Sequence, residues 1–327
     1  IDGDGVPNEL DDLDYDASES VDSDGDGIGD NRDLFVDVQH EMSLWLKADT
    51  ITTLAGGRVS TWLDHANHAD GSNDASQGEP AKQPSLQMNA INGLPAVSFD
   101  GTDRLDLSRN VFANTAITKT VFAVFKSENA DAHLVGTASS DEGYLNSYGA
   151  SLYVDDAGLL SYKANLNAAT QRIKSQSRVD DASIVLASVR VTGESQRLLS
   201  RDTDQANASL SVSESTVYPY TKSTLGAGDG SDIDAIQYAL SGQIAEVMVF
   251  EEALTNCEIS KVHTYLADKY EIEAANDGLV DTDEDGQFNV CDSDDDNDGL
   301  TDSEEDALGI DPLLFDTDGD GMGDQFE

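Results

Sequence analysis

The fold of this chain is decided by Ile244-Ala-Glu-Val-Met-Val-Phe250, a run of β-branched and aromatic residues with a single charge. Thr120-Val-Phe-Ala-Val-Phe125 has the same character. Both runs are typical of buried strands, because such side chains pack well on a pleated surface. Similar short runs, broken by Gly, Asn and Asp, predict strands at 43–47, 58–63, 96–100, 120–126, 151–154, 184–192, 196–201, 207–212 and 242–250.

One helix is predicted near the end of this region. Thr255 or Asn256 is a suitable N-cap, and Glu258 falls in the first turn. The apolar face of this helix would be formed by Ile259, Val262, Tyr265 and Leu266. Many short strands with one late helix predict a mainly β fold, an antiparallel two-sheet jelly-roll sandwich with one C-terminal helix, over residues 38–272.

Several short motifs in this region occur together. They are Trp45-Leu, Trp62-Leu-Asp64 followed by Asn73-Asp74-Ala75, Ile91-Asn-Gly-Leu-Pro95-Ala-Val-Ser-Phe99-Asp-Gly101, and Gly242–Phe250 leading into the predicted helix. With them the region resembles the laminin G-like, concanavalin A-like jelly-roll domains of bacterial surface proteins. The resemblance implies a fold more than a function, because lectins, adhesion modules and some glycosidases share this architecture.

Catalytic signatures are missing from the sandwich. Glycosidases of this fold resemble one another in a Glu-x-Asp-x-(x)-Glu strand, and neither that string nor a Gly-x-Ser-x-Gly elbow occurs here. Glu246 and Glu251 are the nearest pair, but their odd spacing turns them to opposite faces of a regular strand. We therefore expect no enzyme activity, although carboxylates distant in sequence can still converge.

Two pairs of tyrosines are the preferred candidates for glycan contacts. These pairs are Tyr144 with Tyr148 and Tyr218 with Tyr220. A Gly/Asp loop offers a further Ca²⁺ site, with an ordinary loop as the favoured alternative. The candidate ligands in that loop are Asp229, Asp232 and Asp234.

Two other pairs have a structural and a functional interpretation, and the structural one is favoured. Trp45 and Trp62 each lie inside an apolar run, so they are predicted to be core residues rather than sugar platforms. His65 and His68 lie in a polar stretch without further His or Cys nearby, so we expect a loop rather than a transition-metal site.

Both ends of the chain repeat the pattern Asp-x-Asp-x-Asp-Gly, followed by another side-chain oxygen. The clearest copy is Asp22-Ser-Asp24-Gly-Asp26-Gly27-Ile28-Gly-Asp30-Asn-Arg-Asp33, with oxygens at positions 1, 3, 5, 9 and 12 and Gly at position 6. Hard oxygen ligands suit Ca²⁺, the Gly permits a sharp bend, and the next residue offers a backbone carbonyl. A disordered acidic linker is the alternative, but it would not place Gly at position 6 in five copies.

The five copies predict about five or more bound Ca²⁺ ions. The expected ligands are Asp2, Asp4, Val6, Asn8 and Asp11; Asp22, Asp24, Asp26, Ile28, Asp30 and Asp33; Asp281, Asp283, Asp285, Gln287, Asn289 and Asp292; Asp294, Asp296, Asp298, Leu300, Asp302 and Glu305; and Asp316, Asp318, Asp320, Met322, Asp324 and Glu327. The first copy lacks its position 1 and the last ends on its final ligand, so we expect the chain to belong to a longer protein.

These loops differ from EF-hands, which need a helix on each side. Asp292 closes one copy and Asp294 opens the next, so we expect an array without intervening helices, whose interior is metal. With the segments 16–30 and 302–312, the loops resemble thrombospondin type 3 repeats, especially the bacterial version. The resemblance implies calcium-filled spacers at 1–37 and 273–327 in a secreted or surface protein.

Charge is concentrated at the two ends. The formal charge is −47, and residues 1–37 and 271–327 hold 36 of the 65 acids with one base, Arg32. Nucleic acids and anionic membranes are therefore poor partners, and no apolar run approaches the ~20 residues that span a bilayer. Without metal, the ends should be expanded by self-repulsion.

Cys257 and Cys291 are the two cysteines of the chain. A disulfide between the central region and the first C-terminal loop is favoured over two buried thiols, because Ca²⁺ loops point to an oxidising exterior. The sequence thus predicts a calcium-binding, non-catalytic module of a secreted or cell-surface protein that binds a glycan or surface protein. The alternatives are a structural link of a fibre or adhesin stalk, joined to other copies or modules, and an accessory domain of a polysaccharide-degrading enzyme.

Overall fold

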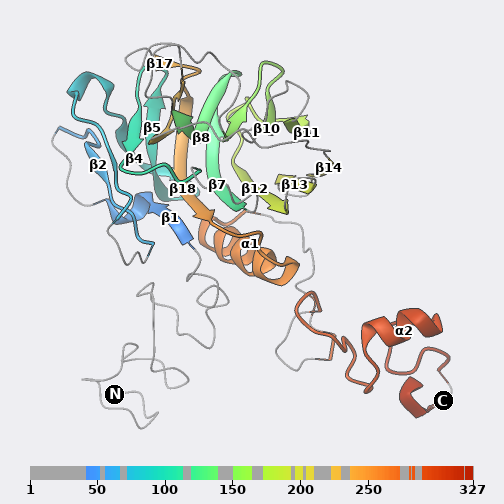
Figure 1. Ribbon diagram of the computed structural model, residues 1–327. Helices are drawn as coiled ribbons and strands as arrows, with labels where there is room; N and C mark the ends of the chain where they lie inside the picture. Colours follow the sequence, from blue (N-terminus) through green and yellow to red (C-terminus); the bar gives the residue numbers. More distant parts are fainter. Residues whose placement is uncertain are drawn as a thin grey trace, which may run out of the picture.

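The computed structural model places the deciding run within β18 (Ser241–Phe250), inside an eight-stranded antiparallel sheet. The residues that the structure describes are 42–51, 56–66, 72–112, 119–138, 150–163, 172–192, 196–201, 204–209, 222–229, 236–272, 280, 282–283, 289–319 and 321–326. The two antiparallel sheets of the central region confirm the predicted mainly β sandwich (Figure 1).

The first sheet is organised around β18. Its order is β14 (Asp204–Ser209), β13 (Gln196–Arg201), β12 (Val185–Thr192), β7 (Lys119–Ser127), β18, β5 (Leu94–Asp100) and β4 (Ser85–Ile91). On the side of β18 away from β7, β5 pairs with its first half and β1 (Met42–Lys47) with its second half.

The second sheet packs against the first and is built from shorter strands. Its order is β11 (Arg172–Arg178), β10 (Leu159–Lys163), β9 (Ser151–Val154), β8 (Ala132–Ala138), β15 (Lys222–Leu225), β6 (Leu105–Leu107), β3 (Ala75–Ser76) and β2 (Thr61–Trp62). A separate two-stranded ribbon joins β16 (Gly228–Asp229) and β17 (Ile236–Gln237).

The continuous apolar character of β18 has a direct explanation. Val247 and Val249 belong to the hydrophobic core between the sheets, whereas Met248 and Phe250 belong to a second core on the opposite face. That face is covered by α1 (Asn256–Tyr270), shown in orange beneath the sheet in Figure 1. Because both faces of the strand are buried, the run does not alternate with polar residues.

The predicted helix is confirmed, with Thr255 as its N-cap. The Thr255 hydroxyl accepts a hydrogen bond from the Glu258 amide, and the Glu258 carboxylate accepts one from the Thr255 amide at 2.6 Å. This reciprocal pair is a capping box. The residues predicted for the inner face, Ile259, Val262 and Leu266, are buried, and Tyr265 packs against the same core.

Asp64 explains why the Trp62-Leu-Asp64 and Asn73 motifs occur together. Its Oδ1 accepts hydrogen bonds from the amides of Trp45 (2.9 Å) and Ala66 (3.0 Å), and its Oδ2 accepts one from the amide of Asn73 (2.8 Å). One carboxylate thus joins β1 to the loop that leads into β3. Its role in this motif is structural.

Several strands differ from the sequence-based expectation. The strand expected at 58–63 is reduced to Thr61–Trp62 of the second sheet, because Arg58 bridges to Ser85 of the first sheet and the chain then crosses between the sheets. The strand expected at 207–212 ends at Ser209 within the described residues. The hairpin of β4 and β5 was missed, although its turn, Asn92-Gly93 with φ of 43° and 89°, is a strong hairpin signal.

The C-terminal segment contains a helix where none was expected. Helix α2 (Asp302–Leu308) lies between the loops that start at 294 and 316. The Glu304 carboxylate accepts a hydrogen bond from the Thr301 amide (3.1 Å), and Gly309 ends the helix with φ of 78°. The expectation of loops without intervening helices is therefore wrong for this pair. A short 3-10 turn, Asp324–Phe326, follows.

Candidate metal centre

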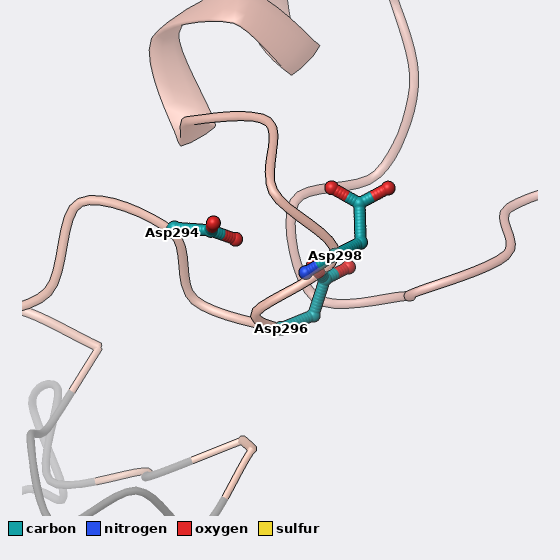
Figure 2. Close-up of side chains that lie close together, drawn as sticks. All are labelled: Asp294, Asp296 and Asp298. Atoms are coloured by element: carbon teal, nitrogen blue, oxygen red, sulfur yellow. The ribbon is translucent and has the colours of Figure 1, made fainter. Parts of the chain in front are cut away.

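Three aspartates of the loop 294–305 converge. Asp294, Asp296 and Asp298 each offer a carboxylate oxygen, and these three oxygens lie within 4.8 Å of one another. Figure 2 shows Asp294 on one arm of the loop, directed toward Asp296 and Asp298 on the other. These residues are positions 1, 3 and 5 of the predicted template, so the structure brings the expected ligands together.

Glu305, at position 12, lies on α2, close enough to the three aspartates for their charges to act on its carboxyl. Its side chain is fully buried, and neither carboxylate oxygen has a hydrogen-bond partner. Burial raises the pKa of Glu305 to about 7, with further contributions from the nearby charges of Asp296 and Asp298. A buried carboxylate without a donor is costly, so this position favours a cation.

The other oxygens of the cluster show the same lack of donors. Asp294 Oδ1 and Asp296 Oδ2 are buried and have no hydrogen-bond partner. The pKa of each carboxyl is raised, mainly by burial, and the neighbouring aspartates add to the effect. Like charges held this closely repel one another unless a positive charge lies between them.

The glycine at position 6 lets the loop close on its own first residue. Gly299 has φ of 99°, and its amide donates to Asp294 Oδ2 at 3.1 Å. In the next loop Gly321 has φ of 98°, and its amide donates to Asp316 Oδ2 at 2.7 Å. The two loops therefore share this closing hydrogen bond, and only glycine adopts this backbone geometry without strain.

The residue at position 9 has a role that the template did not predict. In three successive loops its side-chain oxygen accepts a hydrogen bond from the amide of position 2, and its own amide donates to the carbonyl just before position 1. The side-chain bonds run from Thr282 to Asn289, from Asp295 to Asp302 and from Thr317 to Asp324, each at 3.0 Å. The backbone bonds run from Asn289 to Val280, from Asp302 to Ser293 and from Asp324 to Phe315. We call this pair of bonds the position-9 clamp.

The last two loops contact each other. The Gln325 amide donates to Asp298 Oδ2 at 2.8 Å, and its side-chain amide donates to the Gly299 carbonyl at 3.2 Å. Asp324 is buried and contributes to the raised pKa of Asp296. The acidic repeats are thus packed together, and this part of the C-terminal segment is ordered by polar contacts rather than by an apolar core.

Asp295 was missed by the sequence analysis because it falls outside the template. Its side chain is buried and its Oδ1 has no hydrogen-bond partner. Burial raises its pKa to about 6, and Asp302 and Asp292 contribute further. The run of three consecutive aspartates at 294–296 was the sequence feature that could have indicated Asp295.

Many predicted ligands lie outside the described residues. They are Asp2, Asp4, Val6, Asn8, Asp11, Asp22, Asp24, Asp26, Ile28, Asp30, Asp33, Asp281, Asp285, Gln287, Asp320 and Glu327. The tyrosines proposed for glycan contacts and most of the Gly/Asp loop also lie outside the described residues. They are Tyr144, Tyr148, Tyr218, Tyr220, Asp232 and Asp234, together with the side chain of Asp229 and with His68.

The predicted disulfide is present in the structure. Cys257, in the first turn of α1, is bonded to Cys291, with their Cα atoms 4.8 Å apart. Cys291 immediately precedes Asp292, whose Oδ1 accepts hydrogen bonds from the amides of Ser293 and Asp294. A covalent bond therefore joins the sandwich to the start of the loop 294–305.

The remaining sandwich candidates are structural. Trp45 and Trp62 are buried, as predicted. His65 Nε2 lies 2.8 Å from the Thr50 hydroxyl, and burial lowers its pKa. Among the described residues, the 294–298 cluster is the one group of His, Cys, Asp or Glu that could hold a metal, and no described helix is long and apolar enough to cross a membrane.

Comparison with known proteins shows distant structural likeness. No family model and no curated protein matches the chain. Domain 4 of an extracellular GH43 arabinanase, AbnA from Geobacillus stearothermophilus, aligns with a TM-score of 0.46 at 10% identity, covering 68% of this chain and 98% of that one. A Trypanosoma rangeli sialidase aligns at 0.45 and 13% identity, covering 72% and 34%. The CBM40 of a Ruminococcus gnavus sialidase aligns at 0.40 and 14% identity, covering 51% and 95%.

The chain spans about a quarter to a third of the full sialidases that it matches, with 27% of the Streptococcus pneumoniae NanB chain covered. At these identities and TM-scores the likeness carries no conclusion about activity. Conclusions about function therefore depend on the residues of this chain.

Proposed function

We propose that this chain is a calcium-binding, non-catalytic module of a secreted or cell-surface protein. In this proposal the sandwich binds a glycan or a surface protein, and the acidic repeats are spacers made rigid by Ca²⁺. One observation carries the metal-binding part: Glu305 is fully buried, has no hydrogen-bond partner, and feels the charges of Asp294, Asp296 and Asp298.

Electrostatics argues for a divalent cation at this position. Carboxylates held as close together as those of Asp294, Asp296 and Asp298 either take up protons or bind a cation, and at neutral pH a doubly charged ion relieves the repulsion among them. The ligand set would be Asp294, Asp296, Asp298, Glu305 and the Leu300 carbonyl, all oxygen donors. Oxygen ligands from one loop, with a carboxylate at position 12, suit Ca²⁺ better than Mg²⁺, which demands stricter octahedral geometry.

The position-9 clamp refines the ligand set. Asp302 Oδ1 accepts a hydrogen bond from the Asp295 amide. We therefore propose that Asp302 supports the ion indirectly, as position 9 of EF-hand loops often does through water. Asp316, Asp318 and Met322 would supply the corresponding ligands of the last loop, whose backbone follows the same pattern. The resemblance to thrombospondin type 3 repeats predicts the same function for the N-terminal copies.

The location and the lack of catalysis are proposed on separate grounds. The Cys257–Cys291 disulfide favours an oxidising, extracytoplasmic setting. Glu246, the nearest candidate for a catalytic acid in the sequence, is buried and already accepts hydrogen bonds from Trp45, Tyr265, Lys269 and Tyr270. A carboxylate so fully occupied is not available to a substrate.

Calorimetric titration of the full chain with CaCl₂ tests the metal-binding part. We expect wild-type protein to bind Ca²⁺, and Glu305→Gln to lose one ion from the stoichiometry or to bind it at least about tenfold more weakly. Asp306→Asn is the matched control, because Asp306 is the next residue on α2 and is exposed. No heat of binding in the wild type, or equal titrations for wild type and Glu305→Gln, would contradict the proposal.

A further inference from the structure

We propose that Tyr238 is a stacking platform for a neutral glycan, held in place by His133 and Tyr153 on the second sheet. This inference rests on the proposed binding function of the sandwich and assigns it a location. The tyrosines favoured from the sequence lie outside the described residues, and Tyr238 was not among them.

The three rings form a ladder. His133 and Tyr153 are directly opposed on β8 and β9, with ring centroids 5.4 Å apart and planes inclined by 24°. Tyr238 also contacts His133, with ring centroids 5.6 Å apart and planes inclined by 37°. We call Tyr153, His133 and Tyr238 the aromatic ladder.

The ladder lies on the outer face of the second sheet. Leu152 and Val154, which flank Tyr153 in β9, point into the core between the sheets. Because side chains alternate along a strand, Tyr153 and its partner His133 point away from that core. The ladder therefore does not belong to the hydrophobic core that stabilises the sandwich.

Exposure increases sharply at the end of the ladder. Tyr153 and His133 are almost fully covered, whereas Tyr238 is 42% exposed. Within the described part of the sandwich, the other exposed large apolar side chains are Leu63 and Met88, so Tyr238 is the exposed aromatic residue of this region. A ring that contacts His133 and still remains this exposed is suited to stacking against the apolar face of a sugar.

The backbone of Tyr238 adopts a conformation that is unfavourable for its side chain. Its φ is 51°, in the left-handed region that Gly and Asn tolerate best. A bulky residue there is strained, and such strain is concentrated at ligand sites. Because the ring is not buried, packing into the core does not account for the choice of tyrosine.

The segment that carries Tyr238 is held rigidly. The His133 amide donates to the Tyr238 carbonyl at 2.9 Å. Asn129 accepts a hydrogen bond from the Ser241 amide at 2.8 Å and donates one to the Ala239 carbonyl at 3.0 Å. The platform is therefore fixed before any ligand arrives, which lowers the entropic cost of binding.

Charge selects the class of ligand. Asp131, two residues before His133, is exposed, and the segment 38–270 that contains the sandwich carries 29 acids against 17 bases. An anionic sugar would be repelled by this field, whereas a neutral oligosaccharide is not. Neutral hexose chains, which combine an apolar ring face with hydroxyl groups, are the class that fits.

Titration with neutral hexasaccharides tests the platform. The full chain, with Ca²⁺ present, is titrated with cellohexaose, laminarihexaose, maltohexaose and mannohexaose, and with an alginate hexasaccharide as the anionic comparison. We expect the wild type to bind at least one neutral sugar, Tyr238→Phe to bind it similarly, and Tyr238→Asn to bind it about tenfold more weakly.

Tyr238→Asn also separates a binding role from a structural one. Since Asn tolerates the left-handed region, we expect its thermal midpoint to equal or exceed that of the wild type, whereas a purely structural ladder predicts a lower midpoint. Ala182→Asn is the control, because it relieves a similar φ of 61° elsewhere and should leave binding unchanged.

Each result has one meaning. Equal binding by wild type and Tyr238→Asn would overturn the platform but leave the binding function of the sandwich. The platform would be overturned if none of the neutral sugars bound, or if the alginate hexasaccharide alone bound. If no sugar bound at all, a glycan would also be excluded as the ligand that the proposed function assigns to the sandwich. The CaCl₂ titration decides the metal-binding part independently.

Discussion

The indole Nε1 of Trp45 donates a hydrogen bond to Oε1 of Glu246 across 2.6 Å, and both side chains are buried beneath α1. The same carboxylate accepts hydrogen bonds from Tyr270 (2.8 Å) and Lys269 (2.9 Å). Lys269 also pairs with Asp49 at 3.0 Å. This network joins β1, β18 and the C-terminal half of α1, so Glu246 fixes the helix to the sheet.

Removal of the Glu246 carboxylate should destabilise the sandwich strongly. Glu246→Ala removes the acceptor that Lys269 shares with three other donors and leaves Asp49 to pair with the ammonium, and we expect a loss of about 3–5 kcal/mol in the free energy of unfolding. Glu246→Gln keeps one acceptor oxygen and should lose less. Denaturant unfolding in saturating Ca²⁺ measures the change, with Glu251→Ala, an exposed residue just after β18, as the control. Equal stability of Glu246→Ala and the control would refute this role.

The sequence predicted the parts of the fold where one physical signal dominates. β7 and β18 are recognisable because both of their faces are buried, and α1 because its capping box and apolar face coincide. Strands of the second sheet such as β8 and β15 were missed, since polar residues and glycine interrupt them and their pairing depends on distant segments. Local pattern cannot show pairing of that kind.

For the candidate metal site, the sequence template predicted which residues would cluster but not how each one would be used. Spacing alone identified Asp294, Asp296 and Asp298, which the structure brings together, and Glu305, whose pKa their charges raise. The position-9 clamp could not be predicted, because a carboxylate at this position is equally suited to a metal ion and to an amide. The aromatic ladder was hidden for a related reason, since His133 and Tyr238 are more than a hundred residues apart and meet only through the fold.

The position-9 clamp predicts a difference between two substitutions of Asp302. Asn289 makes the same bond in the preceding loop, so Asp302→Asn should preserve the clamp and bind Ca²⁺ within about threefold of wild type. Asp302→Ala leaves the Asp295 amide without its acceptor, at a cost of about 1–3 kcal/mol, and should weaken binding about tenfold or more.

Calcium titrations of the two Asp302 variants check this prediction. If Asp302→Asn bound as weakly as Asp302→Ala, the charge of Asp302 would matter more than the clamp, and direct ligation of the ion would be indicated. Equal binding by both variants and the wild type would mean that the clamp does not support the site.

The stability of the sandwich should depend on pH through Asp103. Its side chain is buried, its Oδ2 accepts the Asp100 amide at 3.1 Å, and burial raises its pKa to about 6. The folded state therefore keeps this proton up to about pH 6, whereas the unfolded chain releases it near pH 4. Between these two pH values, the free energy of unfolding therefore falls as the pH rises.

Asp103→Asn isolates this effect because Asn keeps an acceptor oxygen but does not ionise. Between pH 4 and pH 7, the free energy of unfolding of the variant should gain about 2 kcal/mol relative to wild type. Urea unfolding of both proteins at the two pH values gives the difference directly. A difference that stays constant, or that changes in favour of the wild type, would show that Asp103 is already ionised in the folded state at low pH.

Calcium removal should open the C-terminal repeats and leave the sandwich folded. The carboxylates of the loop 294–305 repel one another without a cation, while both apolar cores lie within the sandwich and under α1. Trypsin cannot report on this segment, because residues 271–327 contain no Lys or Arg.

A glutamate-specific protease can report on both parts of the chain, since Glu304 and Glu305 lie on α2 and Glu258 lies on α1. We expect cleavage at Glu304 and Glu305 to accelerate about tenfold or more in EDTA, with cleavage at Glu258 unchanged. Equal cleavage rates in Ca²⁺ and EDTA at all three sites would mean that the segment does not need the ion to fold, whereas accelerated cleavage at Glu258 would mean that the sandwich depends on the ion as well.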